Sequence, residues 1–198
     1  MNILTEKRGR NADGGTTALR GFGRRAIRFT RNWIMNVIGK RMKLRYEIIP
    51  EDRTFSVTAP SGRKHFESPA TDKKKSKIYV LLDGAEILYV GQTGQSIRSR
   101  FRGAFQANGE TGFYGYKWRD KRKKLTLLIW ILPDFVATFE GREAVEAEVI
   151  FRVRRDFGYW PRYQNEVHFW NTDEKILTLA DEIFDELKKE PNASTQAQ

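Results

Sequence analysis

Alternating apolar and polar residues predict strands in the first half of the chain. Two strand-like runs cover residues 44–49 and 54–58, with a turn at 50–53 between them. A second turn at 60–62 leads to a short run at 64–66. Runs joined by tight turns are typical of antiparallel strands, so this region is expected to form a small β-meander.

A second group of strands begins at Lys77. Residues 78–82 are apolar, Asp83-Gly84 is a hairpin signal, and residues 86–90 form the returning strand. Farther along, the continuous apolar run at 125–132 predicts another strand. This part of the chain is therefore expected to hold a hairpin and one further strand.

Helical spacing of apolar residues predicts three helices in the second half. Residues 96–105 fit a short basic helix, and residues 140–156 fit a longer one. Asn171-Thr172-Asp173 offers an N-cap for a last helix within residues 171–190. The final residues, 191–198, are expected to be a disordered tail.

The N-terminal region is basic and divides into two parts. Residues 1–23 contain five glycines and few apolar residues, which predicts a disordered arm. Residues 24–40 predict a cationic amphipathic helix. Such a helix could dock on the neighbouring domain or bind DNA, and less favourably could lie on a membrane surface. The arginines expected to contact nucleic acid are Arg24, Arg25, Arg28 and Arg31.

The net charge of +11 lies entirely before residue 76. Residues 1–75 hold 18 Lys and Arg against 7 Asp and Glu, whereas residues 76–198 hold 18 of each. A basic arm on a neutral body is typical of proteins that approach a polyphosphate, although an anionic membrane would also attract it. We therefore expect residues 24–75 to form an accessory DNA-binding region.

Composition removes several classes of site. The chain has no cysteine, which excludes disulfides, thiolate zinc sites and a cysteine nucleophile and fits a reducing cytosol. Two histidines cannot form a three-histidine metal site. Because no apolar run approaches the ~20 residues of a membrane span, and residues 1–10 are polar, we expect a soluble, cytoplasmic protein.

Glu146 is the most informative single residue. On a helical wheel it lies in the middle of the apolar face of helix 140–156, whereas Glu148 points to the opposite side. A carboxylate in that position is desolvated unless a cation compensates it. Two partners remain open: Arg142, one turn back on the same face, or a metal ion.

An ordered set of motifs adds to this. Lys77-Ile78-Tyr79 and Tyr89-Val90-Gly91 place two tyrosines ten positions apart in the predicted hairpin. Gln92-Thr93-Gly94-Gln95-Ser96-Ile97 and Arg100 follow, and then come Glu146 with Val149-Ile150, Pro161 and Asn165. Taken in this order, the motifs resemble the GIY-YIG nuclease superfamily over residues 76–170.

The resemblance implies an α+β fold, with a small three-stranded antiparallel sheet flanked by helices, and metal-dependent hydrolysis of DNA phosphodiesters. It implies that Tyr79 is the general base, that Tyr89 orients water or phosphate, and that Arg100 stabilises the scissile phosphate. It further implies that Glu146 holds Mg²⁺ (or Mn²⁺) and that Asn165 is a supporting polar residue. Double-stranded or branched DNA is the expected partner, with Arg98 and Arg102 as backbone contacts.

The chemistry sets one further requirement. A tyrosine with its ordinary pKa of about 10 is a poor base at neutral pH, so nearby cations must lower that pKa. Arg100, the metal and Arg98 are the available sources. One carboxylate is enough for a hard cation, because water and substrate phosphate fill its other positions.

The sequence departs from the family pattern at three points. Lys77 replaces the first glycine, and Ala104 stands where the family often has a histidine or tyrosine, so that Tyr114 or Tyr116 would have to supply the missing group. The spacing from Glu146 to the terminal polar residue is long, and His168 is a substitute candidate there. A catalytically weakened nucleic-acid-binding module on the same scaffold is therefore the alternative function.

Overall fold

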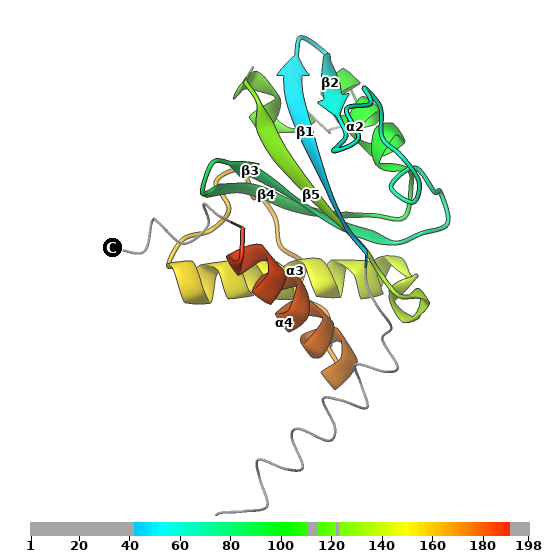
Figure 1. Ribbon diagram of the computed structural model, residues 1–198. Helices are drawn as coiled ribbons and strands as arrows, with labels where there is room; N and C mark the ends of the chain where they lie inside the picture. The colour runs from blue at the N-terminus through cyan, green and yellow to red at the C-terminus, as the bar shows by residue number, and fades with distance from the viewer. Residues whose placement is uncertain (1–41, 111–114, 122, 191–198) are drawn as a thin grey trace, which may run out of the picture. The chain divides into compact units, whose positions relative to one another are not determined.

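A five-stranded antiparallel sheet organises the protein in the computed structural model, which describes residues 42–110, 115–121 and 123–190. The sheet order is β2-β1-β5-β3-β4 (Figure 1). The strands are β1 (Lys43–Glu51), β2 (Thr54–Thr58), β3 (Lys77–Asp83), β4 (Glu86–Thr93) and β5 (Leu125–Ile131). The α-helices are α2 (Ile97–Gln106), α3 (Phe139–Phe157) and α4 (Glu174–Lys188), with 3₁₀ turns η1 (Lys117–Lys121) and η2 (Asp134–Val136).

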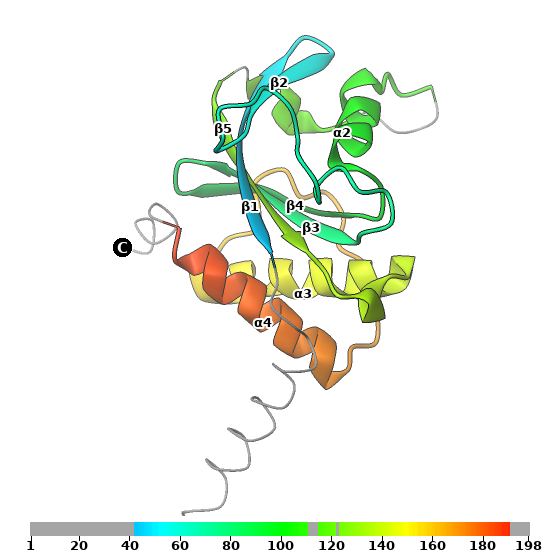
Figure 2. The same ribbon diagram turned by 45° about the vertical axis from the view of Figure 1, so that its right-hand side comes forward.

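Helices cover both faces of the sheet. The pair α3 and α4 runs across one face, and α2 lies on the other side (Figures 1 and 2). Tyr79 faces α2, where its ring meets Phe101 at 5.4 Å between centroids. Trp130 faces α4, where its Nε1 donates to Glu186 Oε2 at 2.8 Å. Since successive residues of a strand point to opposite faces, β3 and β5 are buried on both sides.

The expected three-stranded sheet is corrected to five strands. The two runs expected as a separate meander are β1 and β2, and β1 pairs with β5 from Lys43↔Trp130 to Ile48↔Leu125. Tyr46 and Ile48 are buried against the common core, so the sheet gains a packed surface by accepting β1. Residues 64–66 form no strand, and Phe66 instead fills the core beside α2.

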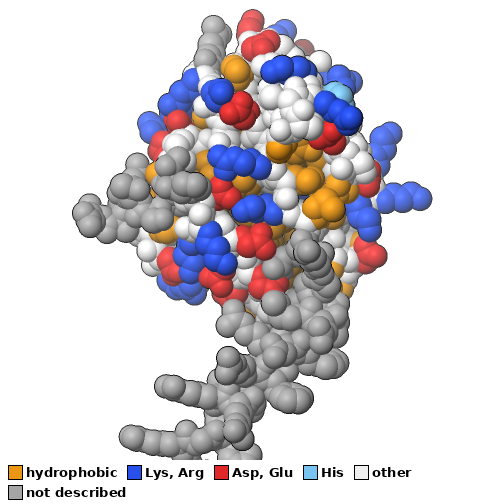
Figure 3. Space-filling model, in the orientation of Figure 1, with side chains coloured by type: hydrophobic (Ala, Val, Ile, Leu, Met, Phe, Trp, Pro, Cys, Tyr) orange, Lys and Arg blue, Asp and Glu red, His pale blue; other side chains and the backbone are white. Residues whose placement is uncertain are grey.

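The helices expected in the second half are confirmed, as is the cap expected for the last of them. Ser96 Oγ accepts from Ser99 N at the start of α2. Asp173 Oδ1 accepts from Ile176 N at 2.9 Å at the start of α4, as the Asn-Thr-Asp signal indicates. Lys and Arg are interspersed with Asp and Glu over the face that carries α3 and α4 (Figure 3).

Several expectations fall outside the described residues. These are the disordered arm at 1–23, the helix at 24–40 with Arg24, Arg25, Arg28 and Arg31, and the tail at 191–198. Within the described ranges, no helix has both the length and the apolar character needed to cross a membrane.

Candidate functional site

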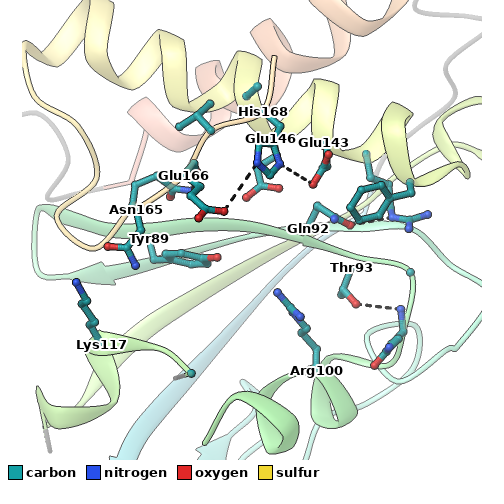
Figure 4. A pocket seen from close by; sticks show the side chains of 18 residues that line it. Tyr89, Gln92, Thr93, Arg100, Lys117, Glu143, Glu146, Asn165, Glu166 and His168 are labelled. Atoms are coloured by element: carbon teal, nitrogen blue, oxygen red, sulfur yellow. Dashed lines mark hydrogen bonds and ion pairs between the residues drawn. The ribbon is translucent and has the colours of Figure 1, made fainter. Parts of the chain in front are cut away.

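An open pocket of about 910 Å³ lies at the outer edge of β4, the last strand of the sheet, between α2 and α3. One wall comes from α2 and η1 and carries Arg100 and Lys117. The other comes from α3 and the loop after it. Glu146 and Arg100 enter from these opposite walls, and Tyr89 lies between them (Figure 4). We call this the site pocket; its acidic lining residues are Glu143, Glu146 and Glu166.

Tyr79 lies beneath the pocket because Gly91 leaves room for its ring. The two residues are opposite one another in the β3–β4 register, and a Cβ on Gly91 would stand 2.4 Å from Tyr79 Cζ. The ring therefore crosses β4 and lies 6.1 Å from the ring of Tyr89. Tyr89 lines the pocket, whereas Tyr79 is fully buried.

Tyr116 supplies a third hydroxyl to this cluster. Its Oη lies 2.5 Å from Tyr79 Oη, and the Arg100 guanidinium carbon is 5.8 Å from the centre of its ring. The preceding residue, Gly115, has φ of +77° and packs directly on the backbone of Ala104, where a Cβ would meet Ala104 O at 2.0 Å. Of the two tyrosines considered for the missing group, Tyr114 lies outside the described residues and Tyr116 joins the site.

The pKa values of the site tyrosines are raised, whereas the proposed chemistry requires a lowered pKa. Burial raises the pKa of Tyr79, and the positive charge of Arg100 and the hydrogen bond from Tyr116 only partly offset it. Burial also raises the pKa values of Tyr89 and Tyr116 well above their usual range. The cations among the described residues therefore do not lower the pKa values of Tyr79, Tyr89 and Tyr116 below their usual range. Arg98 is exposed on a different face of α2 and is not among the main influences on the pKa of Tyr79.

Glu146 faces the pocket from α3, as the helical wheel predicts. Burial raises the pKa of its carboxyl to about 8, with the neighbouring charge of Glu143 acting in the same direction, while Arg100 and a hydrogen bond with Gln164 oppose the shift. The alternative partner, Arg142, is engaged elsewhere: its Nε donates to Gln92 Oε1 at 2.9 Å and its Nη1 donates to Ala137 O. Among the described residues, Glu146 has no ion pair with Arg142.

Glu148 lies on the opposite side of α3, as expected, but it is not a freely solvated residue. Its Oε2 is 2.5 Å from Nη1 of Arg152, a buried arginine whose Nε also donates to Asp181 of α4 at 2.7 Å. Glu148 therefore helps to fix α4 on α3 and is a poor neutral control for Glu146.

The loop after α3 closes the pocket along the β4 edge. Tyr163 N donates to Leu88 O at 2.8 Å, and Gln164 Oε1 accepts from Val90 N at 3.2 Å. These bonds place Gln164 against Glu146, while Asn165 lines the pocket beside it. The resemblance pointed to Asn165 as the supporting residue, and no sequence pattern pointed to its neighbour Gln164.

Glu143 is held by the same loop. Its Oε1 lies 3.2 Å from His168 Nδ1, and its Oε2 accepts from Trp170 Nε1 at 2.9 Å. His168 Nε2 lies 3.8 Å from Glu166 Oε2 (Figure 4). His168 therefore reaches the pocket, and it also has structural partners there.

The residues fit a hard cation held by one carboxylate. No cluster of three or more His, Cys, Asp or Glu able to hold a metal occurs within the described ranges. Glu146 nevertheless presents a carboxyl that is costly to ionise beside Glu143, and a divalent cation would relieve that cost. Water and a substrate phosphate would complete the coordination of Mg²⁺.

Lys77, at the position of the expected glycine, has a structural role. Its side chain is buried, and Nζ donates to the carbonyl oxygens of Asp72, Lys75 and Gln95 at 2.6, 2.5 and 2.9 Å. Burial lowers the pKa of Lys77 to about 8, so the group is mainly protonated at neutral pH. The ammonium ties the start of β3 to the loop that precedes α2.

The structure thus gathers Tyr79, Tyr89, Arg100, Glu146 and Asn165 in and beneath one pocket, with Tyr116, Lys117, Glu143 and Gln164 as further members. It does not bring Arg98 and Arg102 there, because they line a second pocket beside β2. A scan against protein-family models and searches of curated proteins and of solved structures find no match to this chain. The site is therefore interpreted from its own chemistry.

Proposed function

We propose that the protein is a metal-dependent endonuclease that hydrolyses DNA phosphodiester bonds by a GIY-YIG-type mechanism. One observation carries the proposal: Tyr89, Arg100 and Glu146, from β4, α2 and α3, line one pocket, and Tyr79 of β3 lies directly beneath it. Tyrosines and arginines are common separately in protein cores and on surfaces, so their convergence on a desolvated carboxylate is the informative feature.

The side chains on the two walls of the pocket suit the binding and hydrolysis of a phosphodiester. Arg100 and Lys117 face the space where a phosphate would enter, and a guanidinium there stabilises the negative charge that develops on the non-bridging oxygens. Tyr89 lines the same space and can orient water or phosphate. A divalent ion on Glu146 would add further positive charge to the phosphate when bound.

Tyr79 is the proposed acceptor of the proton from the attacking water. In the ionised state its oxygen would accept a hydrogen bond from Tyr116 and would be stabilised by the charge of Arg100. Because burial raises the pKa of Tyr79, base strength at neutral pH depends on additional positive charge brought into the pocket with substrate and metal.

The alternative function is a nucleic-acid-binding module with weakened catalysis. It is favoured by the burial of Tyr79 and by the raised pKa of all three tyrosines, because a neutral and inaccessible phenol is a poor base. The same pocket would then bind phosphate through Arg100 and Lys117 without cleaving it.

Plasmid nicking by the full chain separates the two functions. We expect Mg²⁺-dependent conversion of supercoiled DNA to the open circle, and we expect Glu146→Gln to abolish it, since the amide is nearly isosteric but cannot neutralise a divalent ion. Mg²⁺ should also raise the melting temperature of the wild type at pH 8 and leave that of Glu146→Gln unchanged.

Glu140→Gln is the matched control, because Glu140 is exposed in the first turn of the same helix. It should cleave at the wild-type rate. Binding of DNA without any cleavage by the wild type would favour the binding module, and cleavage by Glu146→Gln at the wild-type rate would rule out its proposed role.

A further inference from the structure

A second, smaller pocket of about 420 Å³ lies between β2 and α2, with Phe66 of the intervening loop beside it. Its charged lining residues are all Lys or Arg, and the neutral Thr54, Ser56 and Gln106 complete its polar lining. We call the four cations Arg53, Lys64, Arg98 and Arg102 the basic groove; His65 lies beside them. In contrast to the site pocket, no Asp or Glu of the described residues lines it.

Packed aromatic rings lie beneath the basic groove. Phe55 of β2 lies 5.8 Å from Phe101 and 5.1 Å from Phe105 of α2, and Phe66 lies 6.2 Å from Phe101. These ring contacts fix β2 and the loop against α2, which lie together in both ribbon views (Figures 1 and 2). The cationic side chains of the groove therefore project from elements that are packed against one another.

Most of these cations are not neutralised. Within residues 42–110, 115–121 and 123–190, Arg53, Arg98 and Arg102 form no ion pair, and Lys64 Nζ donates to the neutral Thr58 Oγ1 at 3.0 Å. Glu67, a carboxylate of the adjoining loop, is engaged by Arg63 at 2.7 Å. Lys and Arg side chains are visible on the surface over β2 and α2, with Asp and Glu side chains among them (Figure 3).

Helix α2 connects the groove to the site pocket. Arg98 and Arg102 are one turn apart and share a face of the helix, whereas Arg100 points about 200° away from Arg98 and enters the site pocket. The two pockets thus lie on either side of the same helix. A ligand that crosses α2 can contact both.

Arg53 adds an observation from the backbone. It stands in the two-residue turn between β1 and β2 with φ of 55°, a left-handed conformation that Gly or Asn adopts more readily than Arg. The chain therefore keeps a cationic side chain at a turn position that disfavours it, facing the same groove as Arg98 and Arg102.

We infer that the basic groove binds the phosphate backbone of the nucleic acid whose reacting phosphate occupies the site pocket. The partner class follows from the uncompensated cations, the absence of acidic lining among the described residues and the position across α2 from Arg100. The inference rests on the proposed function for the identity of the ligand, but it concerns binding and is tested without cleavage.

The test uses the full chain and a short fluorescein-labelled DNA duplex in EDTA, with affinity measured by anisotropy over a range of salt concentrations. Arg98→Gln/Arg102→Gln should weaken binding roughly tenfold near physiological salt and reduce the log-log salt slope by about 1.8, since each neutralised phosphate contributes about 0.9 to that slope. Arg53→Asn/Lys64→Gln should do the same from the opposite wall, and Asn tolerates the left-handed turn.

Lys175→Gln/Lys189→Gln is the matched control, with the same change of charge at exposed positions of α4 and its C-cap. It should leave the slope at the wild-type value. Unchanged slopes in both groove variants would overturn the inference. Binding to anionic vesicles is measured in parallel, and groove variants that lose vesicle binding but keep wild-type affinity for the duplex would also overturn it. Melting temperatures of all variants check that each is folded.

A cleavage assay at saturating DNA and Mg²⁺ keeps the two proposals distinct. Groove-dependent binding without cleavage by the wild type would uphold the inference while the endonuclease proposal fails. Cleavage by the wild type with groove-independent binding would uphold the endonuclease and overturn the groove.

Discussion

Glu146 should make the folded protein less stable as the pH rises. The pKa of its carboxyl is raised from 4.5 to about 8, so between these values the folded state holds a proton that the unfolded state has released. The free energy of unfolding should therefore fall as the pH increases through this window. Glu146→Gln removes the effect and should be more stable than the wild type above pH 8, by up to about 5 kcal/mol, with little difference below pH 4.5.

Chemical denaturation of both proteins at several pH values measures this difference, in the absence of metal. Glu140→Gln, on the exposed surface of the same helix, should parallel the wild type throughout. An unfolding free energy of Glu146→Gln that follows the wild type across the whole range would mean that Glu146 is better solvated than its position indicates.

Tyr116 should act on the rate through Tyr79. Its hydroxyl lies 2.5 Å from Tyr79 Oη, and the hydrogen bond lowers the pKa of Tyr79. Tyr116→Phe should raise that pKa further, slow cleavage at pH 7 by roughly tenfold to a hundredfold, and move the rising limb of the pH–rate profile to higher pH. Tyr163→Phe, which alters a partly exposed ring outside the cluster, should leave the profile in place. A slower rate with an unshifted profile would limit Tyr116 to packing.

A bulge and a glycine in β4 determine where the rings of Tyr79 and Tyr89 lie. The register passes from Leu82↔Ile87 to Leu81↔Tyr89, so Leu88 is an extra residue, and Tyr89 then points to the same face as Tyr79. Gly91 leaves the space that the Tyr79 ring occupies. The side chains of the site thus depend on the local geometry of one edge strand.

Gly91→Ala should disturb that geometry. The new Cβ would stand 2.4 Å from Tyr79 Cζ and 2.7 Å from Tyr89 Cε1, which requires both rings to move. We expect destabilisation of roughly 1–3 kcal/mol and loss of most of the activity. Gly103→Ala is the control, because no atom lies within 4 Å of its added Cβ and alanine favours the helix by ~0.5–1 kcal/mol. Full activity in Gly91→Ala would show that the position of Tyr79 matters little.

The elements that could be predicted from the sequence are those with local signals. Asp173 caps α4 where the pattern indicates, and Asp83-Gly84 turns the β3–β4 hairpin. The pairing of β1 with β5 could not be predicted, because the alternation around Tyr46 and Ile48 specifies a half-buried strand but not its neighbour.

The same limit applies to the site. Glu146 was identifiable because its position conflicts with an apolar helix face, a conflict visible within one element. Tyr116 was one of two tyrosines considered from the sequence, whereas Gln164, which no pattern indicated, enters through a loop that meets β4 only in the folded chain. Residues placed by tertiary contacts of this kind carry no periodic signal.

At the scale of the whole molecule, charge and proposed chemistry are separated along the chain. Residues 1–41 contain ten Lys and Arg and two Asp and Glu, so they hold most of the net charge of +11. The residues around the site pocket all lie between Tyr79 and His168. DNA affinity should therefore be divisible between the N-terminal residues and the described domain.

A chain that begins at Met42 tests this division. The deletion stops there because Lys43 already belongs to β1, pairing with Trp130 and bonding through Nζ to Glu190 Oε1 at 2.6 Å. We expect weaker duplex binding and a smaller salt slope, by about 0.9 for each phosphate that residues 1–41 neutralise, with cleavage preserved at low salt and saturating DNA. If residues 1–41 instead stabilise the domain, the melting temperature should fall while the slope stays near its wild-type value. An unaltered slope would exclude the N-terminal DNA arm and leave the basic groove as the principal backbone contact.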